Sequence, residues 1–333
     1  MNTQLSSASS QPWSRLPRLQ QMTSLNAQAL SGPMACMLMI AVMASISPGF
    51  VSANNFGNIF SQSSVLFVLA IGQMFVILIR GFDISVGAVA ALASVVAVQA
   101  MPHVGESAAI MLGIMTGLLA GALNGYLIAC HGLQPIVVTL GTTLVVRGAA
   151  TALEEAADSM SLGGDGMLQL LGYAAFLGLP LLVWLAAIIS LSAWLITRWL
   201  PFGRWLYMVG GNPEAARLVG VPVRSTETLA YALCGACAGL AGMFLLARSG
   251  TAIATEGAGM ELQAIAACVI GGIALGGGRG SVWQALAGAL FIQALLNGLN
   301  LLGSSPFVSE MVLGAVIVSA GILDYVVRKF KRD

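Results

Sequence analysis

The stretch LGIMTGLLAGALNG, residues 112–125, indicates the fold class of this chain. It has no charged side chain, and glycine recurs at every fourth position, at Gly113, Gly117, Gly121 and Gly125. Residues four apart share one face of an α-helix, so the pattern predicts an apolar helix with one face bare of side chains. A neighbouring backbone can approach such a face closely. The alternative interpretation is that the glycine face lines a path through the protein.

The whole chain has the composition of an integral membrane protein. It is 58% hydrophobic and 8% charged, with a mean hydropathy of +0.90, whereas soluble domains carry about 25% charged residues. Eight long stretches contain no Asp, Glu, Lys or Arg, and two of them are interrupted by the polar segments SPGFVSANN and HGLQP. Because a helical span needs about 20 apolar residues, these stretches predict ten spans.

The fold class we expect is therefore all-α, with about ten transmembrane helices. Period-two alternation, which a membrane β-barrel requires, is absent from the sequence. A polar leader, 1–32, is expected to be disordered and cytoplasmic; the transmembrane domain is 33–327, with a cytoplasmic loop at 198–226, and a basic cytoplasmic tail follows at 328–333. The expected spans are 34–50, 57–79, 84–101, 107–129, 136–152, 173–197, 227–247, 261–277, 281–302 and 307–327.

The basic residues orient the spans, because cytoplasmic loops are enriched in Lys and Arg. With both termini in the cytoplasm, twelve of the fourteen basic residues fall inside, and only Arg147 and Arg248 fall toward the outside. Five spans precede the 198–226 loop and five follow it, so a matching second half would be inverted, as in many transporters.

Several kinds of chemistry are excluded by residue counts. Lys329 and Lys331 are the only lysines, so the chain has no phosphate-binding G-x-x-x-x-G-K-[ST] loop and cannot itself be a P-loop ATPase. His103 and His131 fall on opposite membrane sides, which leaves no histidine-based metal site. We assign no catalytic residue, no metal and no cofactor to this chain, and we expect a non-enzyme. Arg147 is the only clear intramembrane charge in the spans, whereas ion-driven carriers usually place ionisable groups there.

One polar segment, VGGNPEAARLVGVPVRS at 209–225, has the signals of a short exposed helix. Asn212 is a good N-cap and Pro213 suits the first helical position. Glu214 lies in the first turn, where it favours the helix dipole, and Gly220 can end the helix in the left-handed conformation. The segment lies in the expected cytoplasmic loop.

Uncharged polar side chains within the spans are candidates for a translocation path. A polyol that loses its water needs replacement hydrogen bonds, which amides and hydroxyls provide. The alternative is that these groups bond neighbouring helices, at about 1 kcal/mol each. The candidates are Gln73, Thr139, Thr142, Thr143, Gln293, Asn297 and Asn300.

Two glycine-containing segments are expected to form turns before the third and the ninth span. In RGFDISVG, 80–87, Asp83 is expected to cap the third span with Arg80 as a partial partner, and Gly87 follows. In GGGRGSVW, 276–283, the turn residues Gly278, Arg279 and Gly280 precede the ninth span. We interpret both segments as structural turns.

Five motifs in this order resemble the permeases of ribose-type monosaccharide ABC importers. They are GFDISVGAVAALAS, TLGTTLVVRG, GGNPEAARLVGVPV, GGIALGGGRGSVWQALAGAL and NGLNLLG, and the likeness runs from Phe50 to Asp324. The resemblance implies a type II importer permease, multi-pass in the cytoplasmic (inner) membrane of a prokaryote. It implies three partners: an ABC ATPase subunit that binds ATP and Mg, an external sugar-binding protein, and a second permease subunit, identical or paralogous.

The resemblance also implies a role for the exposed short helix, which would dock onto the ATPase. The residues expected to couple the two subunits are Gly211, Asn212, Pro213, Glu214, Ala215, Arg217, Leu218 and Gly220. Alternatives remain open at this point: a permease for another polar solute, such as a nucleoside, an autoinducer sugar or a branched-chain amino acid; an ion-coupled secondary carrier; and a membrane scaffold.

Overall fold

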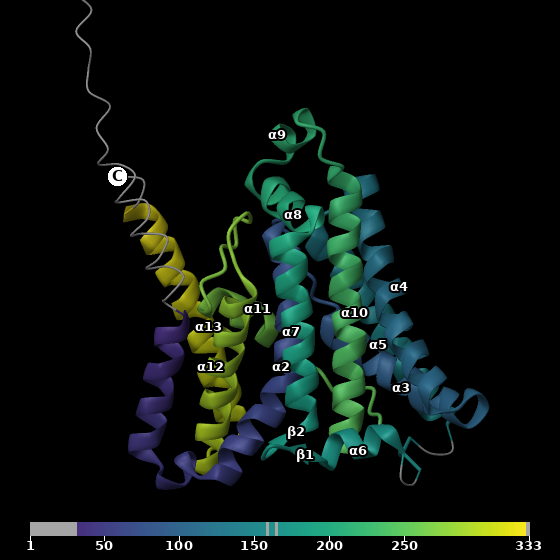
Figure 1. The fold of residues 1–333 in the computed structure, drawn as a ribbon, viewed down its shortest axis with the longest axis vertical. Helices are drawn as coiled ribbons and strands as arrows, with labels where there is room; N and C mark the ends of the chain where they lie inside the picture. Colours follow the sequence, from purple (N-terminus) through teal and green to yellow (C-terminus); the bar gives the residue numbers. More distant parts are fainter. Residues whose placement is uncertain (1–31, 158–159, 164–165, 331–333) are drawn as a thin grey trace, which may run out of the picture.

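The computed structural model describes residues 32–157, 160–163 and 166–330, with 323–330 described by their backbone only. The predicted leader lies outside the described residues except for Gly32, and so do the last three residues of the predicted tail. The described chain forms an upright helical bundle with a small helix, α9, at one end (Figure 1).

Long apolar helices make up the bundle. Seven of the helices in the described part of the chain are long and apolar enough to cross a membrane. They are α2 (Ala53–Leu78), α3 (Val86–Val104), α4 (Glu106–His131), α5 (Pro135–Glu155), α7 (Leu181–Trp199), α10 (Val223–Ser249) and α12 (Val282–Leu301).

The other three expected spans correspond to shorter apolar helices. The first helix runs from Gly32 to Ile46, and α11 is the eleven-residue helix Met260–Ile270. The helix α13 (Pro306–Phe330) is short only when limited to 306–322, where side chains are described. These helices lie with α12 on one side of the bundle in Figure 1. The chain is thus a multi-pass membrane protein.

Short elements lie at the two ends of the bundle. α8 (Pro201–Gly211) and α9 (Pro213–Leu218) form one end, and α6 (Met167–Tyr173) with the hairpin β1–β2 forms the other (Figure 1). Strands β1 (Ala175–Phe176) and β2 (Leu179–Pro180) pair antiparallel, and the 3-10 helix η1 (Pro48–Val51) precedes α2. The expected span 173–197 therefore begins with a hairpin, and its helix starts only at Leu181.

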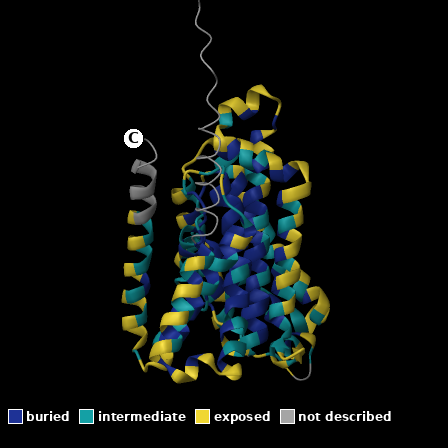
Figure 2. Ribbon diagram, turned by 60° about the vertical axis from the view of Figure 1, so that its left-hand side comes forward, coloured by how far each residue is buried: buried dark blue, intermediate teal, exposed yellow. Residues whose placement is uncertain are grey.

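The core is centred on α2 and α10, which are buried along most of their length (Figure 2). The glycine face predicted on α4 packs against α10. A Cβ on Gly117 would lie 2.3 Å from the carbonyl oxygen of Gly235, and one on Gly121 would lie 2.2 Å from that of Tyr231. A Cβ on Gly113 or on Gly125 would lie 2.7 Å from the nearest atom of α10. The glycine face of α4 therefore lies in close contact with α10.

The eighth expected span, 261–277, is wrong as a continuous helix. The helix α11 ends at Ile270, and Gly272, with φ +95°, takes a conformation that side chains rarely adopt. The chain then turns through 271–281 before α12 starts. The seven residues after Ile270 are apolar and uncharged, so composition alone could not separate them from a helix.

The α4–α10 contact gives a stability prediction. We expect Gly117→Ala to lower the free energy of unfolding by about 1–3 kcal/mol, because the added methyl meets backbone that cannot move aside. Thermal melting in detergent measures the effect. Gly141→Ala on α5 is the matched control, since nothing lies within 4 Å of a Cβ built there. Equal melting temperatures for the two variants would contradict the close packing.

Candidate functional site

The exposed helix α9 forms as the sequence predicts. The Asn212 side-chain oxygen accepts hydrogen bonds from the N–H groups of Glu214, at 3.0 Å, and Ala215, at 3.1 Å. Pro213 occupies the first turn, and Gly220 has a φ of +83°, which ends the helix in the left-handed conformation. These local signals therefore fix both ends of a helix that is only six residues long.

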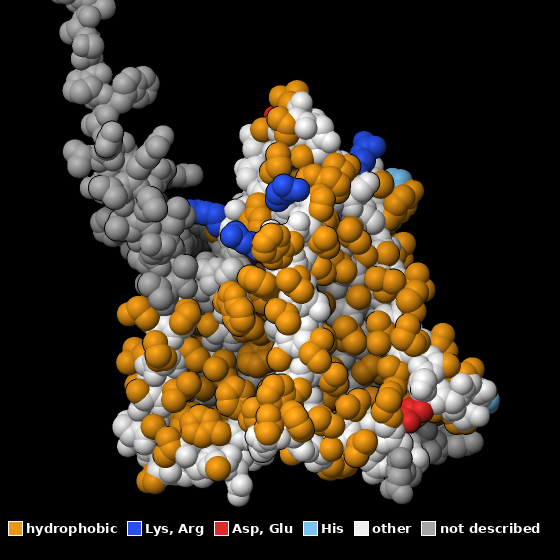
Figure 3. Space-filling model, in the orientation of Figure 1, with side chains coloured by type: hydrophobic (Ala, Val, Ile, Leu, Met, Phe, Trp, Pro, Cys, Tyr) orange, Lys and Arg blue, Asp and Glu red, His pale blue; other side chains and the backbone are white. Residues whose placement is uncertain are grey.

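One face of α9 is anchored and the other is exposed. Ala216 is buried, whereas Glu214, Arg217 and Leu218 are exposed. The Leu218 side chain is 88% exposed, the largest exposed fraction among the large hydrophobic side chains described. Basic side chains gather toward this end of the face shown in Figure 3, and hydrophobic side chains cover the flanks beyond them. Val219, the next residue, is 67% exposed, so the end of α9 presents an exposed apolar surface.

The glycine-rich turn before α12 lies beside the start of α9. The N–H of Gly278 donates to the Leu78 carbonyl of α2 at 2.8 Å, and the Tyr207 hydroxyl of α8 donates to the Gly280 carbonyl at 2.9 Å. Arg279 is exposed. This turn therefore joins the ends of α2 and α8, as the structural interpretation of Gly278 and Gly280 requires.

Asp83 does not cap α3, which corrects the sequence prediction. The residue is only 1% exposed, and its Oδ1 accepts hydrogen bonds from the N–H and the hydroxyl of Ser85, at 2.8 and 2.6 Å. Ser85 itself is the N-cap residue of α3. Arg80 is not its partner, because its guanidinium donates to the carbonyls of Gly210 and Gly211 instead. The chain between α2 and α3 therefore folds back into the bundle.

A hydrogen-bonded polar cluster surrounds Asp83. With its amide oxygen facing the Asp83 N–H, Gln73 accepts from that N–H at 3.2 Å and donates to the Asp83 carbonyl at 3.0 Å. Asn124 of α4 donates to the Ser85 hydroxyl at 3.1 Å and accepts from Thr142 of α5 at 2.6 Å. The cluster therefore connects α2, α4 and α5 through the α2–α3 turn.

The other two candidate threonines, Thr139 and Thr143, hydrogen-bond to backbone carbonyls. Thr139 is buried and donates to the Pro135 carbonyl at 3.0 Å. Thr143 lies within hydrogen-bond distance of the carbonyls of Thr139, at 2.8 Å, and Ile84, at 3.2 Å. Gln73, Thr142 and Thr143 thus meet around the α2–α3 turn.

The candidates on α12 lie apart from that cluster. Asn297 and Asn55 of α2 exchange two side-chain hydrogen bonds, at 2.9 and 3.0 Å, and Asn55 also donates to the Phe50 carbonyl at 2.9 Å. Gln293 is buried, whereas Asn300 is exposed. The structure therefore divides the predicted path residues into two groups, and most of them bond to neighbouring elements.

Gly87 packs against the loop before α11. A Cβ on Gly87 would lie 2.3 Å from the Glu261 Oε2 and 2.4 Å from the Gly257 carbonyl. Close packing at Gly87 agrees with the sequence interpretation. In the same loop, burial raises the pKa of the Glu256 carboxyl, and the Arg248 charge and a hydrogen bond from Ser249 act in the opposite direction.

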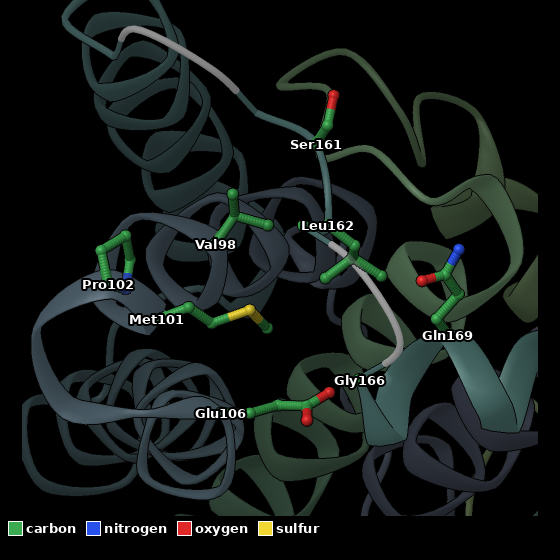
Figure 4. A pocket seen from close by; sticks show the side chains of 9 residues that line it. Val98, Met101, Pro102, Glu106, Ser161, Leu162, Gly166 and Gln169 are labelled. Atoms are coloured by element: carbon green, nitrogen blue, oxygen red, sulfur yellow. The ribbon is translucent and has the colours of Figure 1, made fainter.

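A cavity of about 400 Å³ lies at the end of the bundle opposite α9 (Figure 4). Beside it, the Glu106 carboxylate of α4 accepts hydrogen bonds from the N–H groups of Met167 and Leu168, at 2.8 and 2.7 Å. A residue 61 positions earlier therefore caps α6, which the sequence did not reveal. The cavity is lined by Val98, Met101, Pro102, Glu106, Ser161, Leu162, Gly163, Gly166 and Gln169.

Comparison with known proteins identifies the family. A family model described as the permease component of branched-chain amino acid transport systems matches residues 55–321. The chain belongs to this permease family. The ribose import permease protein RbsC of Escherichia coli K12 is 37% identical over 294 residues, which are 87% of this chain and 91% of the relative. The RbsC protein of Bacillus subtilis 168 is 38% identical over 295 residues, 88% and 92% of the two chains.

A third relative is named for the transport of a different sugar. The D-allose transport system permease protein AlsC of Escherichia coli K12 is 35% identical over 298 residues, 88% of this chain and 90% of the relative. No solved structure matches the permease significantly.

Sequence reasoning did not single out Asn55 and Glu106, and it assigned Arg80 the wrong partner. Each contacts an element more than fifty positions away, so no local pattern indicated its partner. It named Arg147 as the only clear intramembrane charge in the spans and did not anticipate that Asp83, in the turn before α3, is buried. The apolar residues Phe82 and Ile84 next to Asp83 were the one available signal of burial.

The Asp83 cluster leads to a second stability prediction. We expect Asp83→Asn to melt near the parent temperature, because the amide oxygen can still accept from Ser85. Asp83→Leu should lose about 1–3 kcal/mol, since it leaves a buried N–H without a partner. Asn300→Leu, on the exposed side of α12, serves as the control for adding a leucine in melting experiments. An Asp83→Leu permease as stable as the parent would contradict the assigned role.

Proposed function

We propose that this chain is the membrane-spanning permease subunit of an ATP-driven importer and forms the translocation path for a monosaccharide. The likeness to permeases named for ribose and allose import over most of the chain supports this assignment. The chain performs no covalent chemistry. An ATPase subunit supplies ATP hydrolysis with Mg, and an external binding protein delivers the sugar.

The single observation that favours coupling to an ATPase is α9. It is a capped helix outside the apolar bundle, and Glu214, Arg217 and Leu218 are exposed on it. A short helix fixed at both ends can transmit the movement of a partner, whereas an unstructured loop would absorb it. We assign docking to Glu214, Arg217 and Leu218, with Gly211 and Gly220 at the ends of the helix.

The distribution of charge supports placing α9 in the cytoplasm. Basic side chains gather near α8 and α9 on the face shown in Figure 3, and none of the described ones is visible toward the opposite end of that face. Positive residues favour the cytoplasmic side. The binding protein then meets the end that carries α6 and the β1–β2 hairpin. A second permease subunit, identical or paralogous, completes the path in the inner membrane of a prokaryote.

Transport in this proposal follows alternating access. Gln73, Thr142 and Asn297 are bonded within the chain in the present conformation and hold the helices together. A rearrangement that opens these bonds would offer their amides and hydroxyls to sugar hydroxyls, which need replacement partners once stripped of water. The cost of opening the helix contacts is then offset by the new bonds to sugar.

Docking by α9 is tested by variants on its exposed face. We expect Leu218→Asp and Arg217→Glu to abolish both uptake and ATPase co-purification while membrane insertion stays normal. Each variant introduces a negative charge where the parent face has an apolar or a positively charged side chain. Arg217 interacts electrostatically with Glu227, so Arg217→Glu both removes a positive charge and adds repulsion with Glu227. Arg217→Gln removes the charge without adding that repulsion. Arg224→Glu, at the nearby start of α10, is the matched control. Normal uptake by Leu218→Asp and Arg217→Glu would overturn the docking assignment.

The composition of the complex tests the function as a whole. The tagged permease, extracted in a gentle detergent from its native membrane, should bring a stoichiometric partner that has a phosphate-binding loop. Uptake of labelled ribose, with competition by allose, a nucleoside or a branched-chain amino acid, identifies the solute class. An intact permease that transports without any ATPase would favour the ion-coupled carrier, for which the buried Asp83 would be the first residue to examine.

A further inference from the structure

Arg80 adopts a backbone conformation that normally belongs to glycine. The N–H of Gly81 donates to the Val76 carbonyl at 2.9 Å, and the N–H of Arg80 donates to the Ile77 carbonyl at 2.9 Å. This pair of bonds is the Schellman ending of a helix, and Arg80 stands at its left-handed position with φ +68°. A non-glycine residue persists in this region only when its surroundings compensate for the strain.

The compensation comes from the Arg80 side chain. Its Nε donates to the Gly210 carbonyl at 2.7 Å, and its Nη2 donates to the Gly211 carbonyl. These are the last two residues of α8, where helical carbonyls lack partners and the helix dipole favours a cation. The next residue is Asn212, the N-cap of α9. One guanidinium therefore binds the end of α8 directly before α9 begins.

Close backbone packing surrounds this contact. A Cβ on Gly210 would lie 1.7 Å from the Leu78 carbonyl and 2.4 Å from the Gly278 nitrogen. A Cβ on Gly277 would lie 2.5 Å from the Arg80 Cγ. The ends of α2 and α8 and the turn before α12 thus meet without intervening side chains. We call the set Leu78, Arg80, Gly210, Gly211, Gly277 and Gly278 the α2–α8 junction.

The chain on the other side of Arg80 leads into the bundle. Gly81 and Phe82 contact Tyr231 of α10, whose hydroxyl lies 3.4 Å from the Phe82 carbonyl, and Asp83 follows. Asp83 is held by Gln73 and Ser85, and α3 begins three residues later at Val86. Arg80 is therefore the side-chain link between the segment that precedes α9 and the turn that precedes α3.

We propose that Arg80 is a positioning residue that transmits movement of α9 to the α2–α3 turn during transport. The inference rests on the proposed function, because it requires a partner that moves α9. Packing of Gly210 on the Leu78 carbonyl resists compression but not sliding, and the two directional Arg80 bonds tie the last residues of α8 to the end of α2. With the bonds, a displacement of α9 carries the α2–α3 turn and its polar cluster along.

Three variants separate transmission from folding. Arg80→Met keeps the stem that packs on Gly277 and removes both donors. Arg80→Gly also removes the donors but relieves the left-handed strain, so it should fold at least as readily. Arg80→Lys keeps a charge without the planar fork and should restore part of the function. Arg204→Met is the matched control, because Arg204 is exposed on α8, outside the junction.

The experiment measures solute transported per ATP hydrolysed in proteoliposomes that contain the complete complex with its ATPase and binding protein. For Arg80→Met and Arg80→Gly we expect normal ATPase co-purification, continuing ATP hydrolysis and a transport-to-hydrolysis ratio lowered at least about tenfold. Arg80→Lys should give an intermediate ratio, and Arg204→Met the parent ratio.

Two results would overturn the inference. A parent-like ratio in both Arg80→Met and Arg80→Gly would show that the junction transmits nothing through Arg80, while the complex itself, still assembled and active, would leave the proposed function standing. Loss of ATPase co-purification in both variants would show that Arg80 only shapes the docking helix. A failure of the proposed function is distinct, because the parent permease would then bind no ATPase at all.

Discussion

The structure depends on one constraint: backbone polar groups in an apolar environment must find partners within the chain. Long helices satisfy it for most of the permease. The exceptions are the α2–α3 turn and the turn after α11, and both lie against other elements that supply hydrogen bonds. The Gln73 side chain hydrogen-bonds to the backbone N–H and carbonyl of Asp83, and the Leu78 carbonyl accepts a hydrogen bond from the N–H of Gly278. Irregular backbone is therefore tolerated where the protein itself encloses it.

Glycine and the short polar residues perform complementary tasks within that constraint. Glycines on α4 and α10 bring two backbones into contact, which gives packing without a hydrophobic driving force between helices. Hydrogen bonds of Ser85, Asn124 and Thr142 then connect α4 to α5 and to the turn before α3. The bundle is thus rigid along α4 and α10 and connected through exchangeable hydrogen bonds around α2 and α3. An alternating-access permease needs both properties, since rigid bodies must move against one another at contacts that can re-form.

The two ends of the bundle differ in chemistry as the two sides of a membrane do. The α9 end has exposed arginines and an exposed leucine on a capped helix. The opposite end has the α6 helix capped by Glu106 and a short hairpin with exposed Phe176 and Leu177. The α2–α8 junction holds the end of α8 directly before α9 begins.

The sequence by itself determined the features that depend on neighbours along the chain. Absence of charge indicated the long apolar helices. Asn212 and Gly220 set the ends of α9, and the spacing of Gly117 and Gly121 predicted close packing, because each of these signals lies within one or two helical turns. The tertiary structure alone decided what lies far apart in sequence. Asp83 is buried because other helices enclose its turn, and α11 stops early because the chain turns at Gly271, which packs against the Gln284 backbone of α12. Arg80 turns away from Asp83 because unpaired carbonyls at the end of α8 are within its reach.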